Sequence, residues 1–238
     1  MNLYKITNHI NKLGIDVRRY PTALLRNRIK LLKSFDITLV FDVGANIGQY
    51  GEEMRRIGYK DQLVSFEPIK EPYQKLEAAA QNDRKWQTVA IALGDFDGET
   101  EINVAGNLAS SSIRTINERH IEAKPITATV RTELIKVAKL DSIIDDYTDG
   151  KENIFVKIDT QGFEKNVLEG AVNSFDRIRG FQLELSLVEL YEGECLFLEM
   201  IQYLQGFGYE IYSLEPNFWN VETGQLYQAD ALFFRKDG

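Results

Sequence analysis

The chain has 238 residues, of which 44% are hydrophobic and 27% are charged, a composition that excludes disordered, collagen-like and coiled-coil proteins. The formal net charge of −8 argues against a general nucleic-acid-binding protein, because such binding needs surplus lysine and arginine. The single cysteine, Cys195, cannot form an internal disulfide, which predicts a reducing, cytoplasmic compartment and no structural zinc site. No apolar run reaches the roughly 20 residues of a membrane span, and the N-terminus lacks the apolar stretch of a signal peptide.

Residues 1–36 form a basic N-terminal extension, with eight Lys and Arg against two Asp and hence a net charge of +6. We expect a short helix, a break at Pro21, and then a helix whose apolar residues recur at steps of three and four between the basic ones. The first interpretation is an amphipathic helix packed on the acidic remainder of the chain. Peripheral contact with an anionic membrane is the alternative.

Residues 37–238 are expected to form one doubly wound α/β domain, because short apolar or β-branched segments alternate with helical ones. The expected strands are residues 39–43, 63–66, 88–91, 154–158, 181–185, 210–214 and 231–235. The expected helices are residues 48–57, 71–80, 163–173 and 196–207. An insertion at about residues 99–139, with extended segments at 99–105 and 127–139 around a polar loop, is expected to lie over the ligand-binding edge of the sheet.

The first expected strand runs into a glycine-containing loop, DVGANIG (residues 42–48), and a helix follows. The glycines permit a tight turn and a close approach of a ligand to the sheet edge. The third glycine of a dinucleotide fingerprint is missing, so a nicotinamide-dependent reductase is the weaker interpretation. The Gly-Lys-Ser/Thr of a P-loop is also missing.

Glu67 ends the second expected strand, 23 residues beyond Gly44. A carboxylate at this place can accept hydrogen bonds from both ribose hydroxyls of an adenosine-type ligand. A solvent-exposed acid at a strand end is the alternative. The combination of this acid with the glycine loop favours ribose binding.

Five segments in order, FDVGANIGQY (residues 41–50), VSFEP (64–68), ALGD (92–95), SSS (110–112) and VKIDTQGFE (156–164), resemble the FkbM family of S-adenosylmethionine-dependent methyltransferases. The resemblance covers most of the chain. It implies a class I methyltransferase fold, a Rossmann-like, doubly wound α/β sheet of seven strands that is mostly parallel with an antiparallel last strand. It also implies S-adenosylmethionine as cofactor and O-methylation of a sugar or polyketide-type hydroxyl.

The resemblance also implies a set of cofactor-binding residues. The glycine loop would line the methionine part of the cofactor, Glu67 would hold the ribose, and Pro68 or Ile69 would touch the adenine. Residues 92–95 would reach the adenine edge, with an ordinary strand exit as the alternative. The full set is Asp42, Gly44, Ala45, Asn46, Gly48, Glu67, Pro68, Ala92, Leu93 and Asp95.

Four residues are candidates for the chemistry. Asp159 ends the fourth expected strand, where it could act as the base for a hydroxyl or orient it; a cap of the following helix is the alternative. Lys157 shares a strand face with Asp159 and is expected to pair with it, because an unpaired buried ammonium is costly. Glu164 is a second acid, or only a first-turn acid favoured by the helix dipole. His120 is a base in the insertion, or an exposed loop histidine.

Three further features leave alternatives open. Asp159 and Glu184 could jointly hold a divalent metal, but two strand-end acids are common without one, and a metal is not favoured. Residues 110–112 bond the ligand or form a flexible polar loop. Phe218 and Trp219 are expected in a loop between the last two strands, stacked on a sugar ring or packed in the core.

These observations predict a cytoplasmic S-adenosylmethionine-dependent O-methyltransferase that acts on a hydroxyl of a sugar, a polysaccharide or another small metabolite. The residues do not indicate which acceptor this is. A cofactor-binding scaffold or sensor without catalysis is the alternative, and Asp159 argues against it.

Overall fold

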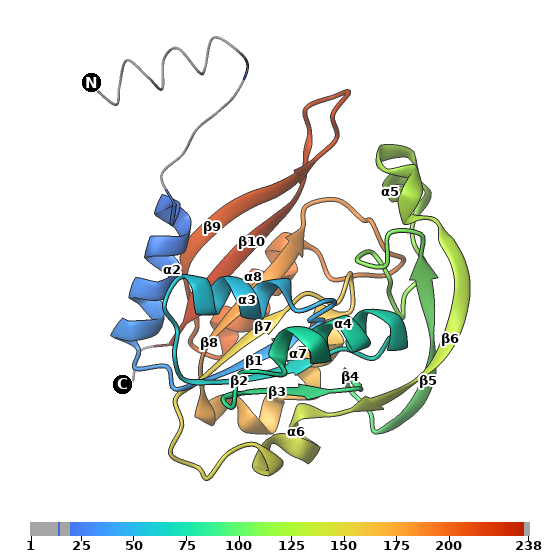
Figure 1. The fold of residues 1–238 in the computed structure, drawn as a ribbon. Helices are drawn as coiled ribbons and strands as arrows, with labels where there is room; N and C mark the ends of the chain where they lie inside the picture. Colours follow the sequence, from blue (N-terminus) through green and yellow to red (C-terminus); the bar gives the residue numbers. More distant parts are fainter. Residues whose placement is uncertain (1–13, 15–19, 236–238) are drawn as a thin grey trace.

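A seven-stranded sheet is the centre of the computed structural model, which describes residue 14 and residues 20–235 (Figure 1). Its strands are β1 Leu39–Val43, β2 Gln62–Phe66, β3 Trp86–Val89, β7 Ile154–Ile158, β8 Ile178–Ser186, β9 Glu210–Trp219 and β10 Leu226–Phe234. Their order is β3-β2-β1-β7-β8-β10-β9. The first five of these run parallel, whereas β10 is antiparallel to both of its neighbours. The expected mostly parallel sheet with an antiparallel last strand is therefore confirmed.

Helices cover both faces of this sheet. On one face lie α2 (Ala23–Ser34), α3 (Gln49–Arg56) and α4 (Lys70–Ala80), whose buried side chains share a core cluster with the sheet. On the other face lie α7 (Glu164–Glu169) and α8 (Phe197–Gly206), which share a second cluster. Every residue of β1 and β7 is buried, as central strands covered on both sides must be.

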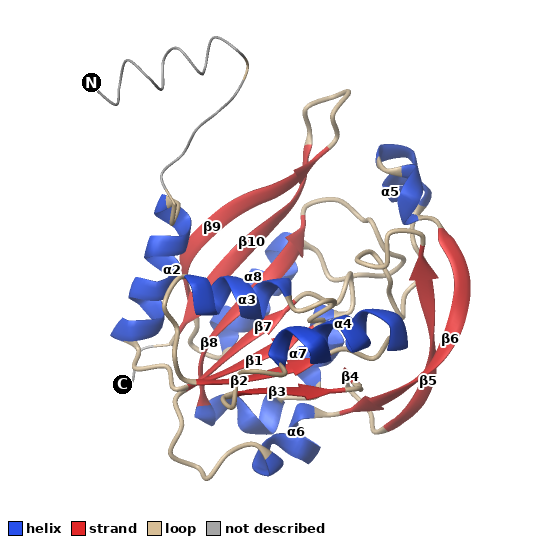
Figure 2. Cartoon of the chain, in the orientation of Figure 1, coloured by secondary structure: helices blue, strands red, loops and turns tan. Residues whose placement is uncertain are grey.

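A small second sheet occupies the place of the expected insertion. Its strands, in the order β4-β6-β5, are β4 Ala92–Leu93, β6 Thr129–Ala138 and β5 Gly98–Ala105. β5 and β6 form a long antiparallel pair, drawn in Figure 2 as a curved ribbon beside the main sheet. The segment between them folds back over the carboxyl edge of the main sheet and carries a short helix, α5 (Glu118–Ala123).

The helix α2 packs on its own acidic domain, as its amphipathic pattern predicts. Its Arg28 is buried and forms ion pairs with Glu53 at 3.0 Å and Glu215 at 3.4 Å. Short helix α6 (Leu140–Ile143) precedes β7 on the opposite face. The short helix expected before Pro21 falls almost wholly on residues outside the described part of the chain. Within residues 20–235, no helix has the length and apolar character needed to cross a membrane.

The expected helix at residues 163–173 is wrong in its length. α7 ends at Glu169 with Gly170 as its cap, and the chain continues as a separate 3-10 helix, Val172–Arg177. Gly170 lies so close to the loop at Gly94 that a Cβ on it would be 1.8 Å from the carbonyl oxygen of Gly94. The cap position is therefore restricted to glycine by a contact distant in sequence.

The expected loop position of Phe218 and Trp219 is also wrong, because both residues belong to β9. Pro216 lies within β9, although proline cannot donate a hydrogen bond to a neighbouring strand. β9 is an edge strand and pairs only with β10 within the described sheet, so it tolerates this proline. The pairing is irregular around Gln228, which accommodates the interruption.

Candidate active site

A cavity opens at the carboxyl ends of β1, β2 and β7, between the main sheet and the insertion. We call it the cofactor cavity. Of the fourteen cofactor-binding and catalytic candidates, seven line it: Gly44, Asn46, Glu67, Pro68, Ala92, Leu93 and Asp159. The other seven candidates lie outside its wall: Asp42, Ala45, Gly48, Asp95, Lys157, Glu164 and His120. The strand-end positions are thus brought together, as the parallel topology requires.

The glycine loop owes its shape to a contact with β7. Gly44 has a φ of +74°, and a Cβ on it would lie 1.9 Å from the carbonyl oxygen of Asp159. Asn46 also adopts a left-handed conformation, with a φ of +50°, and Gly48 caps α3 with a φ of +93°. Glycine at position 44 therefore lets the two halves of the site, the loop after β1 and the end of β7, touch directly.

Glu67 is held in place at the wall of the cofactor cavity by backbone amides. Its Oε2 accepts a hydrogen bond from the amide of Asn46 at 2.9 Å, and its Oε1 accepts one from the amide of Ile69 at 2.9 Å. Burial raises the pKa of this carboxyl to about 7, against the lowering effect of the two amides. The side chain is only 5% exposed, so the alternative of a solvent-exposed strand-end acid is wrong.

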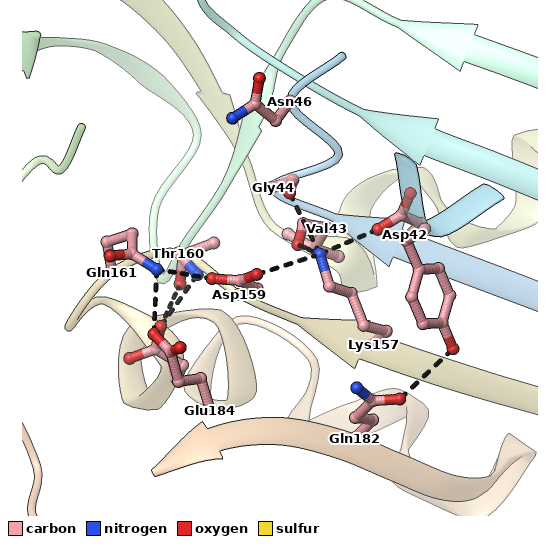
Figure 3. A network of polar contacts seen from close by, with 12 residues as sticks. Asp42, Val43, Gly44, Asn46, Lys157, Asp159, Thr160, Gln161, Gln182 and Glu184 are labelled. Carbon is pink, nitrogen blue, oxygen red and sulfur yellow. Dashed lines mark hydrogen bonds and ion pairs between the residues drawn. The ribbon is translucent and has the colours of Figure 1, made fainter. Parts of the chain in front are cut away.

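A buried ion pair lies beneath the glycine loop (Figure 3). Asp42 is fully buried and pairs with Lys157, whose Nζ lies 3.1 Å from its Oδ1. Ser65 donates a hydrogen bond to the same carboxylate at 3.1 Å. Lys157 also donates to the carbonyl oxygen of Gly44 at 3.1 Å. Burial opposes the charge of Lys157, but the carboxylates of Asp42 and Asp159 more than offset it and raise the pKa of this lysine.

The pair expected between Lys157 and Asp159 is present, with 3.6 Å between Nζ and Oδ2. The side chain of Asp159 is 39% exposed, in contrast to the buried Asp42. α7 begins at Glu164 and its cap is Phe163, so the alternative in which Asp159 caps this helix is wrong. Asp159 is thus accessible to a ligand, and one of its carboxylate oxygens faces the ammonium group of Lys157.

Gln161 organises this part of the site, although it was not among the candidates predicted from the sequence. Its Nε2 donates hydrogen bonds to Asp159 at 2.7 Å and to Glu184 at 2.9 Å (Figure 3). Its Oε1 accepts a hydrogen bond from the hydroxyl of the buried Tyr191 at 2.6 Å. Its own backbone is left-handed, with a φ of +57°, and its carbonyl oxygen accepts a hydrogen bond from Ser112 at 2.6 Å. The turn after β7 is therefore fixed from several directions.

Glu164 supports the same turn from below. Its Oε1 accepts hydrogen bonds from the amides of Thr160 at 2.8 Å and Gly162 at 3.2 Å. It is the first residue of α7, as expected of an acid near a helix N-terminus, and it is buried. Burial raises its pKa to about 7. The contacts indicate a residue that positions the turn rather than one that reaches a ligand.

His120 and the serines are ordered parts of the wall. His120 lies in α5 and is 3% exposed, so the alternative of an exposed loop histidine is wrong. Burial lowers its pKa to about 4, which leaves the imidazole uncharged at neutral pH and makes it a weak base. It lines a second cavity beside the cofactor cavity. Ser111 lines the cofactor cavity, and Ser110 and Ser112 are buried, which contradicts a flexible loop.

Asp159 and Glu184 are separated by the amide of Gln161, which donates to both. In residues 20–235 no group of three or more His, Cys, Asp or Glu has the arrangement of a metal site. The residues that face the cofactor cavity do fit an adenosyl ligand. They combine a fixed carboxylate for ribose, apolar walls from Ile69, Leu93 and Phe163, and a glycine loop.

Comparison with known proteins identifies the family. The family model of the methyltransferase FkbM domain matches residues 42–211. No curated protein matches the chain. The family match begins at Asp42, so α2, the helix that carries Arg28, lies outside it.

Several solved structures share the fold distantly. A Streptococcus pneumoniae protein in complex with S-adenosyl-L-methionine is 12% identical, with 89% of this chain and 73% of that chain covered and a TM-score of 0.47. The 1,6-didemethyltoxoflavin-N1-methyltransferase of Burkholderia thailandensis, with bound S-adenosylhomocysteine, is 10% identical, with 99% and 86% covered and a TM-score of 0.48. A human methyltransferase 10 domain containing protein is 10% identical, with 99% and 96% covered and a TM-score of 0.45. Structures with so little sequence identity do not indicate the methyl acceptor of this protein. The family match spans more than half of the sequence, and the chain therefore belongs to the FkbM methyltransferase family, whose methyl donor is S-adenosylmethionine.

Proposed function

We propose that this protein is an O-methyltransferase that transfers the methyl group of S-adenosylmethionine to a hydroxyl of a sugar, a polysaccharide or another small metabolite. The observation that carries the proposal is Asp159, a partly exposed carboxylate in the wall of the cofactor cavity. A neutral hydroxyl must lose its proton during methyl transfer, and a carboxylate at this place can accept it. The single cysteine, Cys195, supports a reducing compartment, and we propose the cytoplasm.

The residues around the cofactor cavity would divide the binding work. Glu67 would accept hydrogen bonds from the ribose hydroxyls, and its ionised form is the better acceptor. Ala92 and Leu93 lie in the wall where the adenine edge would rest, whereas Asp95 lies outside it. Asn46 lies beside Glu67 and would face the methionine end together with Gly44. The bound cofactor supplies an electrophilic methyl group on a sulfonium.

Asp159 would then orient the acceptor hydroxyl and take its proton at a carboxylate oxygen. Gln161 fixes one oxygen of this carboxylate, and Lys157 lies near the other. Two fixed contacts restrict the rotation of the side chain, and placement of the acceptor against the methyl group is the main requirement of an in-line displacement. Lys157 places a positive charge beside Asp159, without itself reaching the wall of the cofactor cavity.

Calorimetry with S-adenosylhomocysteine tests the first half of the proposal. We expect binding by the natural chain and clearly weaker binding by Glu67→Gln. Absence of binding by the natural chain would overturn the methyltransferase assignment of this cavity.

Methyl transfer tests the second half. The natural chain, with cofactor carrying a labelled methyl group, should transfer label to members of a panel of glycans and hydroxylated metabolites. Asp159→Asn should lose at least about a hundredfold in rate, the lower range for a general base, with unchanged affinity for S-adenosylhomocysteine. Equal rates for the two proteins would contradict the role of Asp159, and a protein that binds the cofactor but methylates nothing would be a scaffold or sensor.

A further inference from the structure

A second cavity lies beside the cofactor cavity, at the carboxyl end of β8 and the amino end of the antiparallel β10. We call it the side cavity. The two cavities share Ala109 and Gln161 in their walls. The wall of the side cavity includes residues of α5, β9 and β10, namely His120, Asn217, Phe218 and Gln228. Anything bound there would therefore lie next to the end of the cofactor cavity at which Asp159 is placed.

The floor of the side cavity is a carboxylate held by three uncharged amides. Glu184 accepts hydrogen bonds from Gln161 at 2.9 Å, from Gln228 at 2.8 Å and from Asn217 at 3.1 Å. In the described part of the chain, no basic side chain forms an ion pair with Glu184. Gln161 and Gln228 use both of their N–H groups, because Gln161 also donates to Asp159 and Gln228 also donates to Ser186. Asn217 keeps a second N–H, and within the described residues the carbonyl oxygens of Asn217 and Gln228 accept no hydrogen bond, so the group still offers a donor and acceptors together. Such a floor suits a ligand that carries several hydroxyl groups.

Two rings complete the wall of the side cavity. Phe218 is partly exposed there, and its ring centroid lies 5.6 Å from that of His120. His120 is almost fully buried, and its Nδ1 has no hydrogen-bond partner. A sugar has hydroxyl groups around its edge and apolar C–H groups on its faces, so it can meet amides and an aromatic face at the same time.

The charges near the side cavity decide between acceptor classes. Burial, together with the nearby Asp159 and Asp230, raises the pKa of Glu184 well above its ordinary value. An anionic acceptor would meet these acids, with only the exposed Lys124 in the wall to attract it. A cationic acceptor would find a carboxylate whose hydrogen bonds already come from three amides and whose ionisation is disfavoured. An uncharged acceptor avoids both costs.

We propose that the side cavity binds the methyl acceptor and that this acceptor is an uncharged, hydroxyl-rich molecule of the glycoside class. The proposal rests on the proposed function, because it assigns the acceptor of that same reaction. Gln161 links the two cavities, since one amide nitrogen donates both to Glu184 on the floor and to Asp159. A hydroxyl held at the floor would thus lie within reach of the base.

A third cavity, between α2, α3 and the sheet, also reaches Asp159. Two of its charged residues are already paired, since Arg28 is joined to Glu53 and Lys157 to Asp42, whereas Asp230 in its wall forms no ion pair within the described residues. This third cavity is therefore the competing location in the test.

The test is a titration followed by nuclear magnetic resonance of the histidine rings. The chain has two histidines, so a sample with labelled histidine gives two sets of ring signals, which His120→Gln assigns. The full chain, saturated with S-adenosylhomocysteine, is titrated with a panel of neutral methyl glycosides, with methyl glucuronides and with methyl glycosides of amino sugars. We expect at least one neutral glycoside to shift the His120 signals, with at least tenfold weaker binding of its charged counterparts. Failure of every neutral glycoside to shift them, or tighter binding of a charged counterpart, overturns the proposal.

Matched variants locate the binding. Phe218→Ala and Glu184→Gln should each weaken glycoside binding at least tenfold, whereas Trp219→Ala and Glu210→Gln, on exposed parts of β9, should leave it unchanged. Retained binding in both cavity variants, or loss of binding in Gln182→Leu of the third cavity instead, overturns the assignment to the side cavity. The affinity for S-adenosylhomocysteine should be the same in all variants. If the natural chain does not bind S-adenosylhomocysteine, the proposed function fails. A glycoside titration in the absence of S-adenosylhomocysteine still tests ligand binding in the side cavity in that case.

Discussion

Replacement of Lys157 by methionine should strongly destabilise the protein. The change removes the partner of Asp42, which is fully buried, and removes the donor to the carbonyl oxygen of Gly44. An uncompensated charge in a buried pair costs about 3–5 kcal/mol. For a chain of this size, that corresponds to a loss of roughly 6–20 °C in the midpoint of thermal unfolding. Methionine keeps most of the volume of the lysine stem, so little of this loss would come from a cavity.

Urea unfolding of the natural chain and of Lys157→Met, followed by far-UV circular dichroism, measures the free-energy difference. The matched control is Lys151→Met, because Lys151 pairs with Asp149 at 3.3 Å on the surface, where both side chains are mostly exposed. An exposed pair of this kind contributes about 0–1 kcal/mol. The control variant should therefore unfold almost like the natural chain.

The double variant Asp42→Asn with Lys157→Met isolates the charge. Once Asp42 is neutral, the lost ammonium leaves no buried charge behind, and Ser65 still bonds the side chain at position 42. The double variant should then be at least about 1 kcal/mol more stable than Lys157→Met alone, which is a coupling between neighbours. The reasoning is refuted if the loss of unfolding free energy in the double variant equals the sum of the losses in the two single variants. It is also refuted if the unfolding free energy of Lys157→Met lies within about 1 kcal/mol of that of the natural chain.

Four further predictions concern the site. Burial raises the pKa of Glu67 to about 7, and binding of S-adenosylhomocysteine uses the ionised carboxylate. The affinity should therefore fall about tenfold per pH unit below 7. Calorimetry from pH 5.5 to 8.5 should show this slope, and Glu67→Gln should abolish it. The same raised pKa means that the unliganded protein loses stability as the pH rises from the ordinary value of a glutamate through about 7, and Glu67→Gln should lack this part of the loss in urea unfolding. Gly44→Ala should prevent stable folding in thermal scans, because its Cβ would lie 1.9 Å from a carbonyl oxygen. The control is Gly58→Ala, at a position with positive φ but open space, which should lower the free energy of unfolding by only about 1–2 kcal/mol. Equal effects of the two variants would contradict the close contact. Tyr191→Phe removes the hydrogen bond to the side-chain amide of Gln161, which in turn holds Asp159. We expect kcat to fall about tenfold, with unchanged affinity for S-adenosylhomocysteine. A change in affinity alone would contradict this positioning role.

The central strands were predictable because their signals are local. Residues 39–43 and 154–158 are short apolar runs in which a polar residue is rare, and β1 and β7 have these bounds. The elements that differ do so through contacts distant in sequence. Gly170, the cap of α7, lies against the backbone at Gly94 with no room for a Cβ, and β9 continues through Pro216 because it lies at the sheet edge. Neither contact leaves a mark in the local pattern.

The same distinction applies to the site. Glu67 and Asp159 were predictable, because each directly follows a parallel strand and such strand ends meet at one edge. The hydrogen bonds of Gln161 were not, because they join it to Glu184 and Tyr191 from later segments and depend on its left-handed backbone. A glutamine two residues beyond a strand is otherwise an ordinary turn residue.

One sheet-level pattern does connect the unpredicted residues, and it rests on the alternation of side chains along a strand. The face that packs against α2 and α3 is apolar in the middle of the sheet, where Phe155 and Leu232 belong to the core. Two residues closer to the carboxyl edge, the same face carries Lys157 on β7 and Asp230 on β10. The register places Lys157 opposite Gln182, and Glu184, two residues farther along β8, opposite Asp230. These polar residues therefore occupy two neighbouring levels of the same face, towards the carboxyl edge of the parallel strands. Packing and chemistry therefore share a single face of the sheet, and the change from apolar to polar residues along each strand marks where the site begins.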